Sequence, residues 1–148
     1  MIKETVLIEK PINEVWDYIV MELAKSFHCS PSQLEGKVVE TTAESFRGKV
    51  RIKQSVSTVR PMEYIEIISE NEDTLARKIY EFVEDELGTH LTSGEAGEGK
   101  KSILRTWNYK LLSFPILRNS SKKKLRYGLM YIKDALEGNL DVEEGENE

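Results

Sequence analysis

The sequence has few of the residues that build disulfide frameworks and transition-metal sites. Its 148 residues include one cysteine, Cys29, and two histidines, His28 and His90. A single cysteine excludes an internal disulfide, and two histidines supply few ligands for a transition metal. His28 and Cys29 are adjacent, and adjacent side chains on a helix point about 100° apart, which disfavours a nucleophile–base pair. We therefore expect no metal site and no cofactor, with stability supplied by packing.

Long apolar runs are also missing. No run approaches the roughly 20 residues that cross a bilayer, and Met1–Thr5 lacks the basic start and apolar stretch of a signal peptide. We expect a cytoplasmic protein without integral membrane association. A hydrophobic content of 39% in 148 residues suffices for one core and one domain. Nothing in the sequence indicates its oligomeric state.

A clustered basic face, which nucleic-acid binding usually needs, is not apparent. The net charge is −5, and five acidic residues near the C-terminus account for all of it: Asp141, Glu143, Glu144, Glu146 and Glu148. The remainder is balanced, which argues against a nucleic-acid partner. We predict a domain over residues 1–138 followed by an acidic tail over 139–148.

Helical spacing is present near both ends of the predicted domain. The apolar strand Val6-Leu7-Ile8 leads through Lys10-Pro11 into a stripe of apolar residues at four-residue intervals: Val15, Ile19, Leu23 and Phe27. Ser30–Gln33 has the pattern of a capping box and predicts a second, short helix that ends at Gly36. A last helix over 121–137 carries one apolar stripe, and Gly128 is expected to let it approach its support closely.

The region between the helices alternates with a period of two residues, which is typical of strands. Alternation and turn signals predict six strands, near 37–46, 49–59, 62–70, 74–84, 88–94 and 102–112. Together with the first strand they make seven, and short connections predict antiparallel neighbours. Because such a sheet cannot hide its apolar face alone, we expect the last helix to cover it in a two-layer α+β domain.

The order of elements resembles the START-like superfamily, also called SRPBCC or the birch-pollen-allergen fold. The resemblance covers about residues 2–138 and is carried by the passage Ile8–Trp16, by Tyr80-Glu81-Phe82 leading to Gly88-Thr89, and by the closing helix Leu125–Glu137. It implies a helix-grip fold, in which a seven-stranded curved antiparallel sheet wraps around a long C-terminal helix, with two short helices between strands one and two.

Within that superfamily the chain is most similar to small uncharacterised bacterial members near the polyketide cyclase and dehydrase branch. Members bind lipids, sterols, polyketides or plant hormones between the sheet and the last helix, and some catalyse reactions there. The resemblance therefore implies a cavity for a hydrophobic small molecule as partner.

Continuing the alternation assigns residues to the cavity wall. Glu66 and Glu70 mark the outside of one strand, and in the second strand Val39, Thr41 and Ala43 should look inward. The predicted ligand-binding residues are Ile52, Gln54, Val56, Ile65, Ile67, Tyr80, Arg105, Trp107, Tyr109, Leu125, Leu129 and Ile132. Tyr127 or Tyr131 is expected to join them from the last helix.

Two assignments stay open at the level of sequence. Arg105, if it points inward, needs a carboxylate or an anionic ligand, although a position near a strand end would let it reach solvent or an internal glutamate. The side of Tyr80 is uncertain because Leu75, Ile79 and Val83 form a competing face.

One motif has the residue spacing of a phosphate-binding loop. Gly94–Lys100 matches the spacing G-x-x-x-x-G-K, but Lys101 stands where serine or threonine should bind magnesium. A phosphate loop opens a helix, whereas 102–112 has the pattern of a strand. We therefore predict a flexible hairpin loop and no nucleotide site.

A basic group begins the last helix, where positive charge opposes the helix dipole. It comprises Arg118, Lys122, Lys123, Lys124 and Arg126. An anionic head group or a membrane surface would compensate this conflict. A solvated helix face that pairs with nearby glutamates is the simpler interpretation.

Three functions remain. The favoured one is a ligand-binding protein, non-enzymatic or of unassigned activity, for a lipid-like or aromatic molecule. The second is an enzyme of the cyclase or dehydratase kind, in which Tyr80, Tyr109 or Arg105 polarises a carbonyl. The third is a protein-interaction domain resembling the Hsp90-activating branch of the superfamily.

Overall fold

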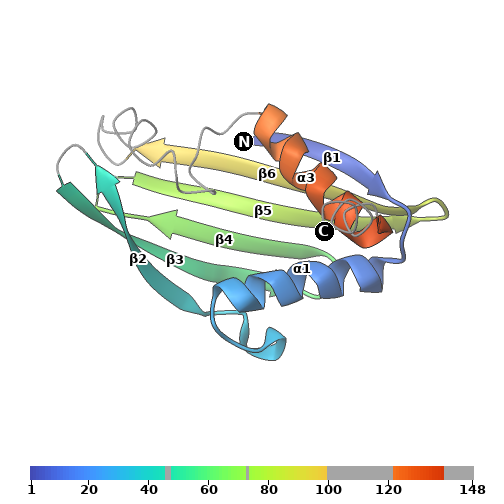
Figure 1. Ribbon diagram of the computed structural model, residues 1–148, viewed down its shortest axis with the longest axis horizontal. Helices are drawn as coiled ribbons and strands as arrows, with labels where there is room; N and C mark the ends of the chain where they lie inside the picture. The colour runs from blue at the N-terminus through green and yellow to red at the C-terminus, as the bar shows by residue number, and fades with distance from the viewer. Residues whose placement is uncertain (46–47, 73, 100–121, 139–148) are drawn as a thin grey trace, which may run out of the picture.

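The computed structural model describes residues 1–45, 48–72, 74–99 and 122–138. These residues form an antiparallel sheet of six strands with helices on one face, an α+β architecture (Figure 1). The elements, in chain order, are β1 (Ile2–Ile8), α1 (Ile12–Ser26), the 3-10 turn η1 (Pro31–Gln33), β2 (Val38–Ser45), β3 (Gly48–Arg60), β4 (Tyr64–Glu70), β5 (Thr74–Asp85), β6 (Gly88–Gly99) and α3 (Lys122–Glu137).

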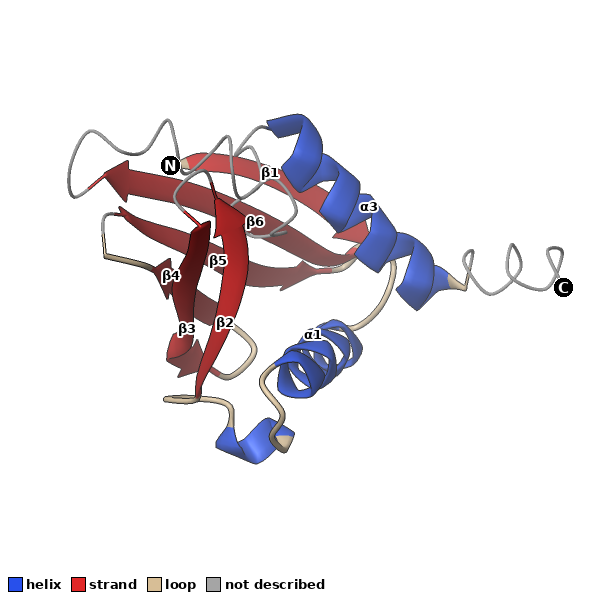
Figure 2. Ribbon diagram, turned by 60° about the vertical axis from the view of Figure 1, so that its left-hand side comes forward, coloured by secondary structure: helices blue, strands red, loops and turns tan. Residues whose placement is uncertain are grey.

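The sheet has the order β1-β6-β5-β4-β3-β2, and both helices lie on its concave side (Figure 2). Strand β1 pairs with β6, for example Ile8 with Thr89, while β5 pairs with the other edge of β6. Both edges of β6 are therefore taken from Thr89 to Glu95. The expected strand at 102–112 lies outside the described residues, so the described sheet has six strands.

The two short helices expected between the first two strands are one 15-residue helix, α1, and a single 3-10 turn, η1. The chain leaves α1 through His28, whose φ of 54° is left-handed and cannot continue a helix. After η1 the chain contacts the sheet at once. Leu34 is buried, and the Gly36 N–H donates to the Val56 carbonyl on β3 at 2.8 Å. No room is left for a second α-helix.

Helix α1 begins without a side-chain cap of its own, because its N-cap residue is Pro11. The carboxylate of Glu84 on β5 supplies the missing acceptor and receives the Ile12 N–H at 3.0 Å. A carboxylate at a helix N-terminus also interacts favourably with the helix dipole. This contact ties the start of α1 to the end of β5.

The apolar stripe of α1 packs against the concave face of the sheet. Val15, Trp16, Ile19 and Val20 are buried, and the rings of Trp16 and Phe82 meet edge to face with centroids 5.0 Å apart. Burial of such a stripe is the main source of stability for a helix of this length.

Strand β6 is longer than expected. The Gly94–Lys100 segment was predicted to be a hairpin loop, but residues 94–99 pair with β5, Ile79 facing Gly94 and Thr74 facing Gly99. The pairing is close at Gly94, where an added Cβ would lie 2.9 Å from Met1 Sδ and 3.0 Å from Ile79 Cγ1. The loop prediction is therefore wrong. A strand in this position also does not have the geometry of a phosphate loop.

Helix α3 lies along β1, the edge strand, and is fastened to it by polar contacts. Lys133 Nζ donates to the Leu7 carbonyl at 2.7 Å and to Glu137 Oε2 at 2.8 Å. Glu137 in turn accepts the Glu9 N–H at 2.9 Å. A lysine and a glutamate on α3 thus satisfy backbone groups at the end of β1, as an edge strand requires.

This fastening gives a pH-dependent stability. The hydrogen bond from Lys133 holds the pKa of Glu137 below its usual value of 4.5, so its contribution is complete above pH 4.5 and is lost as the pH falls through the lowered pKa. We expect Glu137→Gln to be less stable than the unchanged protein at pH 7, and the difference to shrink towards pH 3. Urea unfolding at both pH values measures it. An equal difference at both would show that the carboxylate charge is not responsible.

Gly128 does not have the packing role that its position predicts. A Cβ added there would meet no described atom within 4 Å. Since glycine inside a helix is less favourable than alanine by roughly 0.5–1 kcal/mol, Gly128→Ala should raise the free energy of unfolding by about that amount. Thermal and urea unfolding measure the change. A loss of stability would mean that the methyl group meets a neighbour after all.

Candidate functional site

The register of the strands determines which side chains share the concave face. Val56 on β3 faces Ile67 on β4, Ile67 faces Lys78 on β5, and Lys78 faces Glu95 on β6. Directly opposite residues of an antiparallel pair project to the same side of the sheet. The concave face is therefore a continuous surface across β3, β4, β5 and β6, which we call the inner face.

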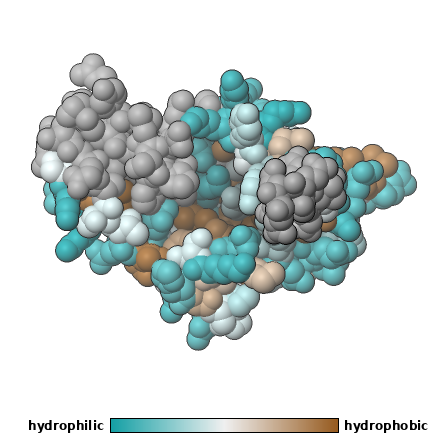
Figure 3. Space-filling model, viewed as in Figure 1, coloured by the Kyte–Doolittle hydropathy of each residue, from teal (hydrophilic) through white to brown (hydrophobic). Residues whose placement is uncertain are grey.

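One part of the inner face is apolar. Among the predicted wall residues, Ile52, Val56, Ile65, Ile67, Leu125 and Leu129 are buried, and Ile132 is half-buried. Figure 3 shows apolar surface in the middle of the helix-bearing side, over the sheet between α1 and α3. Arg105, Trp107 and Tyr109 lie outside the described residues. The part that any of these residues plays in binding stays a prediction.

Polar side chains interrupt this apolar surface. Gln54 is half-buried and donates from Nε2 to the buried Ser69 Oγ at 2.9 Å. The side of Tyr80, which the sequence left open, is settled by pairing: Tyr80 faces Ile65 on β4 and Ser93 on β6, so its ring lies on the inner face. Ile79, one position earlier, is buried on the opposite face.

An ion pair lies beside Tyr80. Lys78 Nζ is 3.1 Å from Glu95 Oε2, and the two side chains keep only 21% and 8% of their surface exposed. The ammonium is also 5.4 Å from the centre of the Tyr80 ring, within the range of a cation–π contact. Few charged side chains are this buried unless they are paired, and here each has its partner on the neighbouring strand.

The Lys78 ammonium is favoured in spite of its burial. Burial by itself would lower the pKa of Lys78, but the charges and hydrogen bonds of Tyr80 and Glu95 outweigh it, and the pKa lies above the usual 10.5. Lys78 is therefore charged at neutral pH. A protonated amine is not a nucleophile, so this lysine suits charge pairing and hydrogen bonding rather than covalent catalysis.

Ser93 is the unusual polar group of the inner face. It is 2% exposed, and its buried Oγ has no hydrogen-bond partner in the described part of the chain. Thr89, on the same strand and the same face, is equally buried but donates from Oγ1 to the Lys10 carbonyl at 2.8 Å. Buried hydroxyls are nearly always paired, so the unpaired Ser93 Oγ requires an explanation.

Sequence reasoning missed Lys78, Ser93 and Glu95. Lys78 is two residues from Tyr80 and shares its face, so the alternation that places Tyr80 inside also places Lys78 there. Glu95 was missed because the strand was expected to end at residue 94, whereas Ser93 lay inside that expected strand and was not singled out. Without the longer β6, Glu95 has no assigned side.

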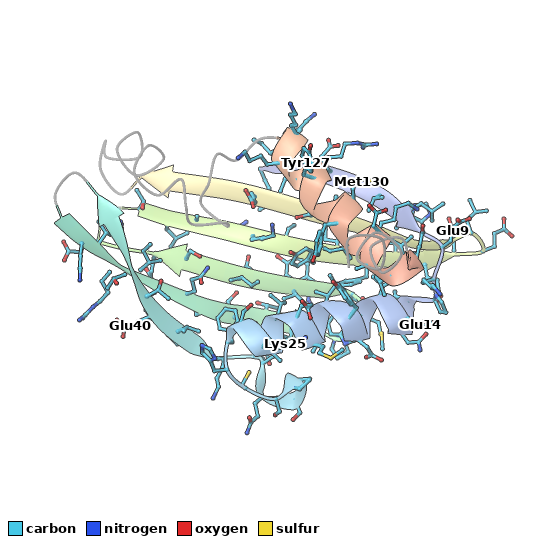
Figure 4. The ribbon with its side chains drawn as sticks, viewed as in Figure 1. Glu9, Glu14, Lys25, Glu40, Tyr127 and Met130 are labelled. Carbon is cyan, nitrogen blue, oxygen red and sulfur yellow. The ribbon has the colours of Figure 1, made fainter. Side chains whose placement is uncertain are left out.

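One other expectation for the site is wrong. Tyr127 is 71% exposed on α3 (Figure 4), and Tyr131 is 60% exposed. Val39 and Thr41 lie on the inner face as expected, since they pair with Gln54 and Ile52; Thr41 is exposed there because β2 is the outermost strand.

The basic residues of α3 are on its surface. Lys122, Lys123 and Lys124 are exposed, and Arg126 Nη1 is 3.5 Å from Glu4 Oε1. This pair agrees with a solvated helix face that contacts a nearby glutamate; Arg118 lies outside the described residues. None of the described helices is both long enough and apolar enough to span a bilayer.

No metal centre is present among the described residues, where no group of three possible ligands comes together. His28 is exposed and Cys29 is half-buried beside α1. His90 Nε2 is 2.7 Å from Asp85 Oδ2 across the β5–β6 hairpin, a contact that sequence neighbours did not reveal. That pair lies at the exposed turn of the hairpin, and neither residue is on the polar part of the inner face.

Comparison with known proteins supports the fold and goes no further. No protein-family model matches the sequence, and no protein with a curated description matches it. A protein from Deinococcus radiodurans has a similar structure with a TM-score of 0.54 and 13% identity over 93% of this chain and 98% of its own. A conserved protein from Geobacillus kaustophilus gives 0.53 and 14% over 92% and 94%.

A protein of the dynemicin biosynthetic locus is also similar, with a TM-score of 0.43 and 14% identity, over 85% of this chain and 46% of its own. That score is too low to support an argument. At these identities the likeness shows a shared α+β fold and assigns no ligand or reaction.

Proposed function

We propose that this protein binds a hydrophobic or aromatic small molecule between the inner face and α3. The observation that carries the proposal is the composition of the inner face: buried apolar side chains surround a few buried polar groups, among them the unpaired Ser93 Oγ. Small-molecule sites are typically apolar walls with a small number of placed polar groups. The resemblance to the START-like superfamily, with its helix-grip fold and cavity ligands, supports the same conclusion.

A second candidate is a cyclase- or dehydratase-like enzyme. Tyr80 favours it, because its ring lies on the inner face beside the Lys78 ammonium. In such an enzyme the Tyr80 hydroxyl would donate a hydrogen bond to a substrate carbonyl and polarise it. Loss of turnover on a polyketide-like substrate in Tyr80→Phe, with substrate binding kept, would support this reading. Unchanged turnover in that variant would remove Tyr80 from the mechanism.

Native mass spectrometry of the freshly purified protein tests the binding proposal. A stoichiometric mass excess over the denatured protein, recovered as an apolar compound by organic extraction, is the expected result. If the protein is isolated empty, a fluorescent apolar probe such as 1-aminoanthracene should bind saturably. Neither bound cargo nor saturable probe binding would overturn the proposal.

A matched pair of variants locates the binding. Ile67 is buried on the inner face, and Ile68 is half-buried on the opposite face of the same strand. Phenylalanine adds volume at either position. Ile67→Phe should weaken probe binding several-fold because it fills the inner face, whereas Ile68→Phe should leave it unchanged. Equal effects would show that the probe does not bind on the inner face.

A further inference from the structure

The polar groups of the inner face carry information about the head group of the ligand, and this inference rests on the proposed function. Ser93 and Glu95 are two residues apart on β6 and therefore project to the same side, about 7 Å apart along the strand. Lys78 faces Glu95, and Tyr80 faces Ser93, on the neighbouring strand. Four polar side chains thus form a compact group that includes the Ser93 hydroxyl, which has no partner among the described residues.

The hydrogen-bonding capacity of this group is only partly used. The Ser93 hydroxyl can donate one hydrogen bond and accept two, and none of these is used by a described residue. The Lys78 ammonium has three N–H donors; Glu95 Oε2 accepts one at 3.1 Å and Tyr80 accepts another, which leaves one for a ligand. A ligand oxygen placed here could therefore accept from Lys78 or Ser93, and a ligand hydroxyl could donate to Ser93.

The charges of the group are already balanced. Lys78 is paired with Glu95 at 3.1 Å. Glu4, which faces Ser93 from β1, has the guanidinium of Arg126 at 3.5 Å. A carboxylate or ammonium brought by a ligand would lose its hydration without gaining a free counter-charge from these residues. An uncharged oxygen would lose much less.

We infer that the ligand has an apolar body and an uncharged polar head, a hydroxyl or a carbonyl, and that Ser93 and Lys78 hydrogen-bond to this head. Tyr80 lines the same place and lets an aromatic or flat apolar body lie against its ring. This specificity separates phenols, alcohols and ketones from fatty acids and other carboxylates.

Three probes with one ring system test the head group. Naphthalene, 2-naphthol and 2-naphthoate are titrated at pH 7 by fluorescence and calorimetry. We expect 2-naphthol to bind about tenfold more tightly than naphthalene, and 2-naphthoate no more tightly than naphthalene. Equal affinity for naphthalene and 2-naphthol overturns the inference and leaves the proposed function standing. Tighter binding of 2-naphthoate overturns the uncharged head, and no binding of any probe counts against the proposed function itself.

Two serine variants separate a ligand contact from a structural role. Ser93→Ala should abolish the preference for 2-naphthol, leave naphthalene binding unchanged and leave the melting temperature unchanged or higher, because it removes an unpaired buried hydroxyl. Ser69→Ala is the matched control: it removes the acceptor of Gln54, so it should lower the melting temperature and keep the preference. If Ser93→Ala instead lowers the melting temperature and keeps the preference, Ser93 pairs with a buried water and the inference is wrong.

Discussion

Replacing Lys78 by methionine is expected to lower the free energy of unfolding by about 3–5 kcal/mol. The reason is the partner left behind: the Glu95 side chain is 8% exposed and would keep a buried carboxylate without a counter-charge. Urea unfolding at pH 7 measures the loss. Because the pKa of Lys78 lies above 10.5, the pair is intact at neutral pH, and its contribution should decline only as the pH rises past that value.

Two controls make this prediction specific. The pair Lys3–Glu81 has the same N···O distance, 3.1 Å, but its side chains are 47% and 38% exposed, so Lys3→Met should cost at most about 1 kcal/mol. The double variant Lys78→Met/Glu95→Leu removes both buried charges and should recover most of the loss. Equal losses of stability in Lys78→Met and Lys3→Met would contradict the burial of the Lys78–Glu95 pair.

Replacing Gly88 by alanine is expected to lower the free energy of unfolding by about 2–5 kcal/mol. Gly88 has a φ of 140°, which L side chains rarely adopt. Its new Cβ would also overlap the Ile8 carbonyl oxygen and lie 3.1 Å from Glu9 Cα. Backbone at the end of β1 cannot yield without disturbing the pairing of Ile8 with Thr89. Urea unfolding measures the effect.

Gly36 provides the control for this substitution. It also has a positive φ, 86°, but an added Cβ meets no described atom within 4 Å. Gly36→Ala therefore introduces backbone strain without a clash and should cost about 1–2 kcal/mol. If the two variants lose the same stability, the close approach of β1 and Gly88 is not the cause.

The periodic parts of the fold could be read from the sequence. Alternation placed β2, β3, β4 and β5 within a few residues, and the stripe from Leu125 to Leu136 placed α3 within one. Each of these elements buries one regular face, so the spacing of its apolar residues in the sequence follows from which side packs against the core. The number of strands was harder to predict from the sequence. β1 pairs with β6, which is distant from it in the chain, and no local sequence pattern indicates which strand edges are paired.

The charged residues of the candidate site could not be predicted from the alternation of apolar and polar residues, for a related reason. Alternation treats a charged residue as a marker of the solvent side, and Lys78 and Glu95 break that rule only because each neutralises the other. Their pairing depends on the register of β5 against β6, a property of two strands together. Ile65 and Ile67, whose burial needs no partner, were placed correctly.

The most direct test of ligand binding on the inner face is a titration of the protein with 2-naphthol, followed through the methyl NMR signals of its isoleucines. Ile65 and Ile67 lie on the inner face of β4, while Ile68 on β4 and Ile79 on β5 lie on the opposite face of the sheet. We predict saturable shifts of the Ile65 and Ile67 signals with those of Ile68 and Ile79 unchanged. Shifts confined to the Ile68 and Ile79 signals, or no shifts at all, would contradict ligand binding on the inner face.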